Sequence, residues 1–468
     1  MEIWSAAAFY FGIFIAVYMI IVIGFYSVIL FISMLQLRKE YNLDTDLAYE
    51  EYENENFTRP VSIIVPAYNE EAGIIPSVRS LLGINYPEFE IIVVNDGSKD
   101  STLETMIRHY GMKEINKVIR QQVPAKKVKA VYQSEMLPHL YLIDKENGGK
   151  ADALNAGLNL SSFPYFCSLD GDSILERDAF IKVMKPIIQS NEEVIASGGS
   201  IRIANGCEIE NGNILKVGLS RNPLVIMQTI EYLRAFLMGR IGLSRHNLLL
   251  IISGAFGVFS KKWVIDAGGY KRDTVGEDME LVVRLHRLIK EKGERKRIVY
   301  IPDPVCWTEV PEEMKYLRRQ RSRWHRGLFE SLSNHKNIVF NPKYGSIGFI
   351  SFPYFWIVEF LGPIVELTGY LYIILALFLG GIYMEFAILI FLLSCLYGSI
   401  FSMASVLLEE WSLRKYPKVS HLLKLFFYSV TETLWYRPLT VLWRFEGIIQ
   451  IIKGDVSWGD MKRKGVSK

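Results

Sequence analysis

The sequence predicts an α/β domain, with a mostly parallel sheet and helices on both faces, flanked by transmembrane and interfacial helices. Continuous β-branched runs at residues 61–65 and 89–94 are typical of strands buried on both faces, and a turn and a helix follow each. Half of the chain is hydrophobic, and the excess lies in residues 3–37 and after about residue 345, which predicts the membrane helices. Ligands of open α/β sheets bind beyond the carboxyl ends of the strands, so a site is expected there.

The composition argues against nucleic-acid binding and against a disulfide framework. The formal net charge of +3 is close to neutral for 468 residues, so the chain lacks the basic footprint that nucleic acid requires. The cysteines show neither metal-ligand nor framework spacing, which favours reduced, buried thiols. They are Cys167, Cys207, Cys306 and Cys395.

Residues 1–38 predict an N-terminal transmembrane helix. Residues 3–37 carry no charge and are too long and too uniformly apolar for a secretory signal peptide; a buried core helix is the weaker alternative. Arg38 and Lys39 follow at once, and the positive-inside bias therefore puts the next segment in the cytosol. Residues 39–59 are acidic and polar and predict a linker.

The α/β domain is predicted over residues 60–310, with a basic surface excursion at residues 115–140. Polar side chains follow its predicted strands, and the carboxyl ends of parallel strands meet at one edge of a sheet. These side chains are therefore expected to share one crevice. They are Asn69, Glu70, Asp96 and Asp170.

Asp170 and Asp172 lie one residue apart at the end of an apolar, strand-like segment. In a strand such positions point the same way, so both carboxylates can converge on one hard cation, Mg²⁺ or Mn²⁺. Gly171 between them leaves room for a diphosphate. Taken alone, an Asp-x-Asp pair is more often a solvated turn.

Two further segments contain residues that could bind substrate or take part in catalysis. In residues 145–150 a Gly-Gly pair precedes Lys150 at a helix start, which allows close backbone approach and adds a cation, although an ordinary loop and cap would look the same. Gly276 opens an acidic, amphipathic helix with Glu277 and Asp278, and helix capping is the simpler interpretation of Asp278 alone.

The rest of the chain is basic or apolar. Residues 222–252 predict interfacial helices or a soluble core pair, and residues 311–344 predict interfacial amphipathic helices whose outer arginines could instead bind anionic headgroups. Residues 345–452 predict transmembrane and interfacial helices, the first of them broken by prolines. Three spans there would put the basic tail, residues 453–468, outside, against the positive-inside rule, so the number of spans stays open.

Taken in order, these motifs resemble the processive family-2 glycosyltransferases, the inverting membrane synthases of cellulose, chitin, hyaluronan and poly-N-acetylglucosamine. The resemblance covers roughly residues 60–330 and is strongest to the bacterial poly-β-N-acetylglucosamine type. We expect neither a cellulose-synthase gating segment nor a cyclic-dinucleotide domain, and Gly276 stands where several relatives have Thr. The motifs are residues 61–71, 95–98, 147–155, 170–172, 253–257, 276–278 and 320–324.

The resemblance implies a GT-A-like fold and a set of site residues. It assigns the metal to Asp172 with help from Asp170, and catalysis to Asp278 as general base beside Glu277. The donor nucleotide sugar is implied to contact Asn69, Glu70, Asp96, Lys150, Asp170 and Arg323. The acceptor is implied to contact Gly254, Ala255, Phe256, Gln320 and Trp324.

The implied function is transfer from a UDP-sugar, UDP-N-acetylglucosamine first and UDP-glucose second, to a growing β-linked polysaccharide. The implied place is the plasma membrane, multi-pass, with the catalytic domain in the cytosol and with export across the bilayer, to which accessory subunits could contribute. One alternative is transfer of a single sugar to a lipid carrier. Another is a non-catalytic export or scaffold subunit with a decayed transferase domain, against which the intact Asp172, Asp278 and Arg323 speak.

Overall fold

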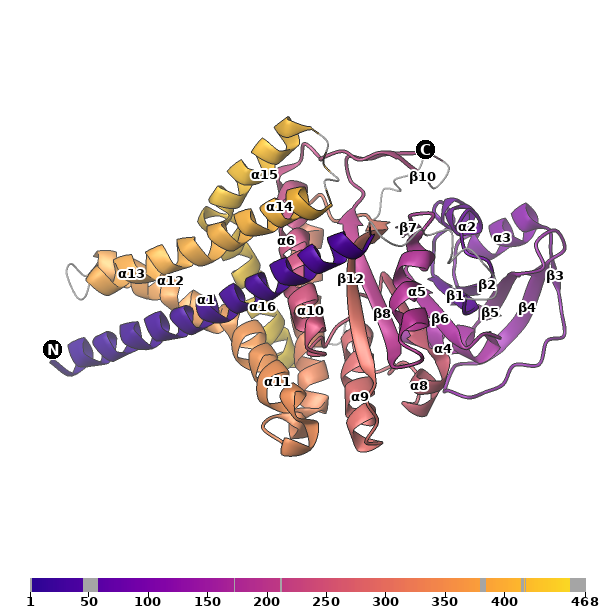
Figure 1. Ribbon diagram of the computed structural model, residues 1–468, viewed down its shortest axis with the longest axis horizontal. Coiled ribbons are helices and arrows are strands. Elements are labelled where there is room, and N and C mark those ends of the chain that lie inside the picture. Colours follow the sequence, from indigo (N-terminus) through magenta and orange to yellow (C-terminus); the bar gives the residue numbers. More distant parts are fainter. Residues whose placement is uncertain are drawn as a thin grey trace.

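The computed structural model separates an α/β domain from a group of long apolar helices, as Figure 1 shows. It describes residues 2–44, 58–171, 173–210, 213–378, 384–413, 416 and 418–454. Asp172, most of the predicted linker and the basic tail beyond residue 454 lie outside the described residues.

The described residues form one ten-stranded mixed sheet with the order β3-β4-β5-β2-β1-β6-β11-β8-β12-β7. Its centre is parallel, since β1 pairs in parallel with β2 and β6, and β2 with β5. Every residue of the predicted strand at 61–65 is buried, as expected for a strand covered on both faces. The strands are β1 (Val61–Ala67), β2 (Phe89–Asn95), β3 (Met112–Glu114), β4 (Val128–Ser134), β5 (Leu140–Lys145), β6 (Tyr165–Leu169), β7 (Ile174–Leu175), β8 (Val194–Ile203), β11 (Phe256–Ser260) and β12 (Arg297–Thr308). A separate hairpin pairs β9 (Glu208–Glu210) with β10 (Asn213–Lys216).

Two parts of the sheet differ from the sequence-based expectation. The predicted surface excursion contains β4, which pairs antiparallel with β5 and carries β3 at the edge of the sheet. Strand β11 runs antiparallel between β6 and β8, with Phe256 opposite Leu169. Because β11 begins where β6 ends, residues 253–255 lie beside Asp170.

Helices follow the strands at the predicted places. In the α/β domain they are α2 (Ile74–Leu82), α3 (Thr102–Tyr110), α4 (Lys150–Leu160), α5 (Ala179–Gln189), α8 (Lys261–Asp266) and α9 (Glu277–Glu291). Residues 223–245 form α6 (Pro223–Leu233), the π-helix η2 (Arg234–Arg240) and α7 (Ile241–Arg245). Helix α4 packs on β1 and β2, and its residue Gly157 touches Ile64.

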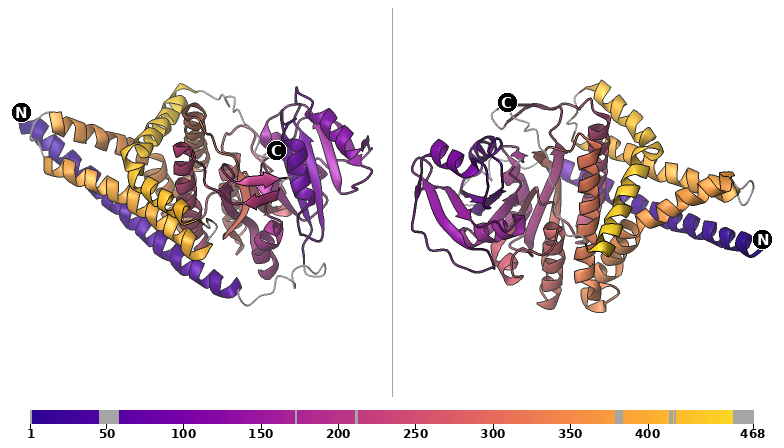
Figure 2. Two further views of the ribbon diagram at one scale, coloured as in Figure 1. Left: turned by 90° about the horizontal axis from the view of Figure 1, so that it is seen from above. Right: turned by 180° about the vertical axis from the view of Figure 1, so that it is seen from behind.

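Among the described residues, three helices are long and apolar enough to cross a membrane: Ala8–Lys39, Ile347–Leu375 and Met384–Ser412. They project together from the α/β domain in both views of Figure 2. The first belongs to α1 (Glu2–Asp44), which continues past residue 38 because residues 39–44 contain no glycine or proline. The second combines η5 (Ile347–Ser351), α11 (Phe352–Tyr354), η6 (Phe355–Phe360) and α12 (Gly362–Phe378). The third combines α13 (Met384–Cys395), η7 (Leu396–Ile400) and α14 (Phe401–Ser412).

The second apolar helix is irregular, as its prolines predict. Pro353 and Pro363 lack the N–H that an α-helix requires, and wide π-turns at η5 and η6 accommodate this loss. Helices α15 (Val419–Thr431) and α16 (Tyr436–Lys453) are not among the three candidate spans. Helix α16 packs along α10 (Met314–Asn334), where Ser322 donates a 2.8 Å hydrogen bond to the carbonyl of Trp443.

The contact between α4 and β1 gives a test of the packing. A Cβ on Gly157 would lie 2.3 Å from Ile64 Cγ2, so we expect Gly157→Ala to destabilise the protein by about 1–3 kcal/mol through overpacking. Gly83→Ala is the matched control, because the atom nearest to its Cβ would be 3.5 Å away and its φ is −92°. Equal unfolding temperatures for the two purified variants would contradict the packing described here.

Candidate active site

The loops that follow β1 and β2 are joined by hydrogen bonds. The Lys99 N–H donates to Asn69 Oδ1 at 2.8 Å, and the Asn69 N–H donates to Ser98 Oγ at 3.0 Å. The Glu70 N–H donates to Thr102 Oγ1 at 2.9 Å. The Asn69 backbone has φ +56°, a left-handed conformation that Asn tolerates better than most residues. The Asn69 side chain thus helps to join the loops after β1 and β2 at the carboxyl edge of the sheet.

Asp96 is surrounded by donors from the loop after β5. Its carboxylate accepts from the backbone N–H groups of Gly148 at 2.9 Å and Gly149 at 2.7 Å, and from Lys145 Nζ at 2.5 Å. A Cβ on Gly97 (φ +66°) would lie 2.8 Å from Asn147 N, so only glycine fits this approach. Asp96 is 3% exposed, and its contact with the donor nucleotide sugar stays a prediction.

Lys150 begins α4 and reaches across to the end of β6. Its Nζ lies 2.6 Å from Asp170 Oδ1 and 3.6 Å from Glu277 Oε1, and it donates to the Gly254 carbonyl at 3.2 Å. Burial alone would lower the pKa of Lys150, but the carboxylates of Asp170 and Glu277 outweigh it and raise this pKa. Lys150 is therefore a permanent cation in this crevice.

Glu277 and Asp278 are the first two residues of α9, and they lie near Lys150 and Gly254, respectively. The Gly254 N–H donates to Asp278 Oδ2 at 3.1 Å, and the Met279 N–H donates to Asp278 Oδ1 at 2.8 Å. Burial raises the pKa of Glu277, although Lys150 partly opposes it. A Cβ on Gly254 would lie 2.8 Å from Lys150 Nζ and 3.6 Å from Asp278 Oδ2. A side chain at residue 254 would therefore displace the end of the Lys150 side chain.

The predicted acceptor residues Ala255 and Phe256 lie at the start of β11. Ala255 borders the crevice, since its carbonyl accepts from the Asp170 N–H. Phe256 is fully buried in the core with its ring 5.6 Å from that of Phe180. The Phe256 side chain thus packs in the core, and a contact between residue 256 and the acceptor stays a prediction.

Helix α10 carries the other predicted acceptor residues. Trp324 is 44% exposed, with the Arg321 guanidinium 4.4 Å from its ring centroid. Gln320 is buried and accepts from Arg321 Nη1 at 2.7 Å. Arg323 is half-buried. Arg321 also pairs with Glu231 at 2.6 Å, so this arginine is bound within the protein rather than to lipid.

A glycine contact, missed from the sequence, joins α9 to α10. A Cβ on Gly276 would lie 2.9 Å from Gly327 Cα, so the backbones of the two segments touch. Glu330 Oε2 accepts from Thr274 Oγ1 at 2.8 Å and from the Val275 N–H at 2.9 Å. The acidic start of α9 is thereby held against α10. A glycine inside a helix, one turn after Trp324, was the available signal.

The donor set at the end of β6 fits a hard divalent cation. Asp170 supplies carboxylate oxygens at the crevice, while Asp172 lies outside the described residues. In the described part of the chain, no group of three or more His, Cys, Asp or Glu side chains could hold a metal. One or two carboxylates together with substrate phosphates are a usual set of ligands for Mg²⁺ or Mn²⁺.

The fold resembles that of a solved glycosyltransferase. The mannosyltransferase PcManGT from Pyrobaculum calidifontis, solved with GDP-Man and Mn²⁺, superposes with a TM-score of 0.54 at 17% identity. The match covers 90% of this chain and 99% of that one. The predicted GT-A-like fold class is confirmed.

Curated relatives are similar over part of the chain. Poly-beta-1,6-N-acetyl-D-glucosamine synthase of Staphylococcus aureus (strain COL) is 31% identical over 299 residues, 64% of this chain and 60% of the relative. That of Staphylococcus epidermidis is 30% identical over 275 residues, 58% of this chain and 55% of the relative. The matched part thus spans about 60% of the length of the first relative.

The family match covers the crevice itself. Residues 59–327 match the family described as "Glycosyltransferase like family 2", which is more than half of the chain. This region contains β1 to β12, and with them the residues that meet around Gly254. The chain belongs to glycosyltransferase family 2, as its motifs predicted.

Proposed function

We propose that this protein is an inverting, processive glycosyltransferase that extends a β-linked exopolysaccharide from a UDP-sugar. UDP-N-acetylglucosamine is the first choice of donor and UDP-glucose the second. One observation carries the proposal: Lys150, Asp170 and Asp278, from three distant parts of the chain, meet around the backbone of Gly254. A cation and two carboxylates in one crevice are what transfer from a nucleotide sugar requires.

The donor side of the crevice must bind a diphosphate and stabilise it as it leaves. Lys150 supplies a fixed positive charge, and Arg323 supplies a guanidinium suited to phosphate oxygens. Asp170 and Asp172 would hold Mg²⁺ or Mn²⁺, which when bound neutralises charge on the diphosphate. Asn69, Glu70 and Asp96 border the place expected for the nucleoside.

Asp278 is the proposed general base. The acceptor hydroxyl forms a bond to the anomeric carbon of the donor and loses its proton to the Asp278 carboxylate, while the bond to the diphosphate breaks. The Gly254 N–H bonded to Oδ2 fixes the orientation of this carboxylate. A single displacement inverts the anomeric centre, so an α-linked donor yields a β-linked product.

Processive extension requires that the acceptor stay bound between transfers. The exposed face of Trp324 is suited to stacking on a sugar ring, beside Gln320, and the glycine contact between α9 and α10 links this platform to Asp278. Gel analysis of the product separates this function from single transfer to a lipid: a ladder or smear supports it, and a single glycolipid contradicts it.

We further propose a multi-pass topology in the plasma membrane. With three spans, the two C-terminal ones return the chain to the side of the catalytic domain, so the basic tail becomes cytosolic in accord with the positive-inside rule. The second span carries Glu359 and Glu366, and Glu366 forms a bidentate pair with Arg437 of α16 at 2.7 Å. Carboxylates at such depth commonly line polar pathways, which supports export of the polymer with or without accessory subunits. Sealed vesicles that retain all polymer on the catalytic side would contradict export.

The donor is tested directly with purified enzyme and a panel of radiolabelled UDP-N-acetylglucosamine, UDP-glucose and GDP-mannose. We expect polymer from the first, and its digestion by linkage-specific hydrolases identifies the bond. Polymer from GDP-mannose alone would contradict the proposed donor class.

Asp278→Asn is expected to lower the rate of sugar transfer by about 10²- to 10⁴-fold, because the amide cannot accept the proton. The dissociation constant for UDP, measured by calorimetry, should change little, which shows that the crevice is intact. Transfer within tenfold of the wild-type rate would exclude Asp278 as the base.

Removal of divalent ions with EDTA is expected to abolish transfer, and Mg²⁺ or Mn²⁺ is expected to restore it. The carboxylates at the end of β6 and the donor diphosphate are all negatively charged, so a cation is needed between them. Unchanged initial rates in chelated enzyme would remove the metal from the proposal.

Gly327→Ala is expected to lower kcat about tenfold or more, because its Cβ would lie 3.0 Å from Gly276 Cα and displace the start of α9. Asn334→Ala, at an exposed position of the same helix, is the control and should retain the wild-type rate. If both variants have the same kcat, the glycine contact does not position Asp278.

A further inference from the structure

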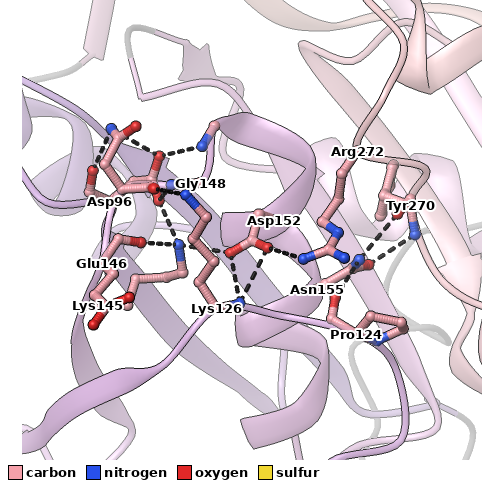
Figure 3. Close-up of polar contacts among 12 residues, drawn as sticks. Asp96, Pro124, Lys126, Lys145, Glu146, Gly148, Asp152, Asn155, Tyr270 and Arg272 are labelled. Atoms are coloured by element: carbon pink, nitrogen blue, oxygen red, sulfur yellow. Dashed lines mark hydrogen bonds and ion pairs between the residues drawn. The ribbon is translucent and has the colours of Figure 1, made fainter.

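A fully buried lysine, absent from the mechanism above, lies directly behind the donor side of the crevice. Lys145 ends β5 and is 0% exposed. Its Nζ lies 2.5 Å from Asp96 Oδ1 and 2.7 Å from Asp152 Oδ1, and it donates to the Glu146 carbonyl at 2.6 Å. Figure 3 shows these contacts as one connected set.

Each partner of Lys145 contacts a different part of the segment that joins β5 to α4, residues 146–149 and the first turn of α4. Asp96 accepts from the N–H groups of Gly148 and Gly149, the two residues before Lys150. Asp152 lies in the first turn of α4, two residues after Lys150, and a Cβ on Gly148 would lie 2.5 Å from its Cγ. Through Asp96 and Asp152, Lys145 therefore stabilises the backbone on both sides of Lys150.

Asp152 extends the network away from the crevice. It accepts from the Lys126 N–H at 3.0 Å and from Arg272 Nη1 at 3.1 Å. Burial alone would raise the pKa of Asp152, but the hydrogen bond from Lys145, with those from Lys126 and Arg272, lowers it. These donors favour the ionised carboxylate, and the hydrogen bond from Lys145 is the largest of the favourable contributions.

The structure of this loop is expected to depend on the positive charge of Lys145. Removal of one partner from a buried ion pair leaves the other charge uncompensated, which costs far more than the loss of an exposed pair. Without the Lys145 ammonium, Asp96 and Asp152 would repel each other across the loop. The Gly148 and Gly149 N–H groups would then lose their fixed acceptor.

We propose that Lys145 is a positioning residue for the donor nucleotide, acting through Asp96 and Asp152 to fix the loop over residues 146–149 and the start of α4. The proposal rests on the proposed function, because it assigns Lys145 to the binding of the UDP-sugar rather than to the transfer step. Lys145 itself touches neither donor nor acceptor.

The test compares Lys145→Met with Lys145→Arg and with Lys182→Met. Lys182 of α5 is a matched control. It too is largely buried and pairs with two carboxylates, Asp178 at 2.8 Å and Glu176 at 3.4 Å. Three quantities are measured on the full-length protein: the dissociation constant for UDP, KM and kcat for the donor, and amide hydrogen exchange of peptides covering residues 146–150.

Lys145→Met is expected to raise the UDP dissociation constant and the donor KM tenfold or more, with kcat within threefold. Exchange at residues 146–150 should become faster. Lys145→Arg should restore most of the affinity, and Lys182→Met should change neither affinity nor exchange at this loop, even if it lowers the unfolding temperature. If Lys145→Met does not fold, Asp152→Asn carries the test, with an expected change of threefold or more in the same direction.

The outcomes separate this inference from the proposed function. Unchanged KM and unchanged exchange in a folded Lys145→Met or Asp152→Asn variant overturn the positioning role. A fall in kcat alone also overturns it. The wild-type protein could bind no UDP and transfer no sugar while exchange at residues 146–150 is still faster in the variant. That result would contradict the proposed donor class but would support the role of Lys145 in holding the loop.

Discussion

The 2.6 Å ion pair between Lys150 and Asp170 joins the start of α4 to the end of β6, and the rest of the crevice is arranged around it. It forms because α4, which follows β5, packs on β1 and β2, while β6 pairs in parallel with β1, so that the start of α4 and the end of β6 lie at the same edge of the sheet. Strand β11 then pairs antiparallel with β6, and the segment before it brings Gly254 to Lys150 and Ala255 to Asp170. The same glycine positions Asp278 through its N–H. Sheet topology thus determines which charges meet.

The start of α9 is connected to α10 and α16 by backbone and side-chain contacts. Gly276 and Gly327 touch, and Glu330 holds the two residues before Gly276. Helix α10 is in turn bound to α16 by the Arg318–Glu446 pair and by Ser322. In the proposed function, this series of contacts keeps the acceptor platform at a fixed distance from the base while the polymer advances.

Local patterns predicted much of this arrangement. The β-branched runs at β1 and β2 and the polar residues after them located the crevice, and Lys150, Asp170 and Asp278 do meet there. Local patterns could not predict the direction of β11, since an apolar strand pairs equally well either way, nor that Phe256 faces the core. Lys145, Gly327 and Glu330 were missed because their roles depend on partners 49 to 56 positions away in the sequence or on backbone contacts between helices. Asp172 stays a prediction.

The stereochemistry of the product is a direct test of single displacement with Asp278 as base, because one base and one displacement permit only inversion. Polymer made from UDP-N-acetylglucosamine labelled with ¹³C at the anomeric carbon can be measured by NMR, where the one-bond carbon–proton coupling distinguishes the two anomers. We expect β-linkages throughout. A product with α-linkages would mean retention, and it would contradict a crevice in which Asp278 acts as the single base.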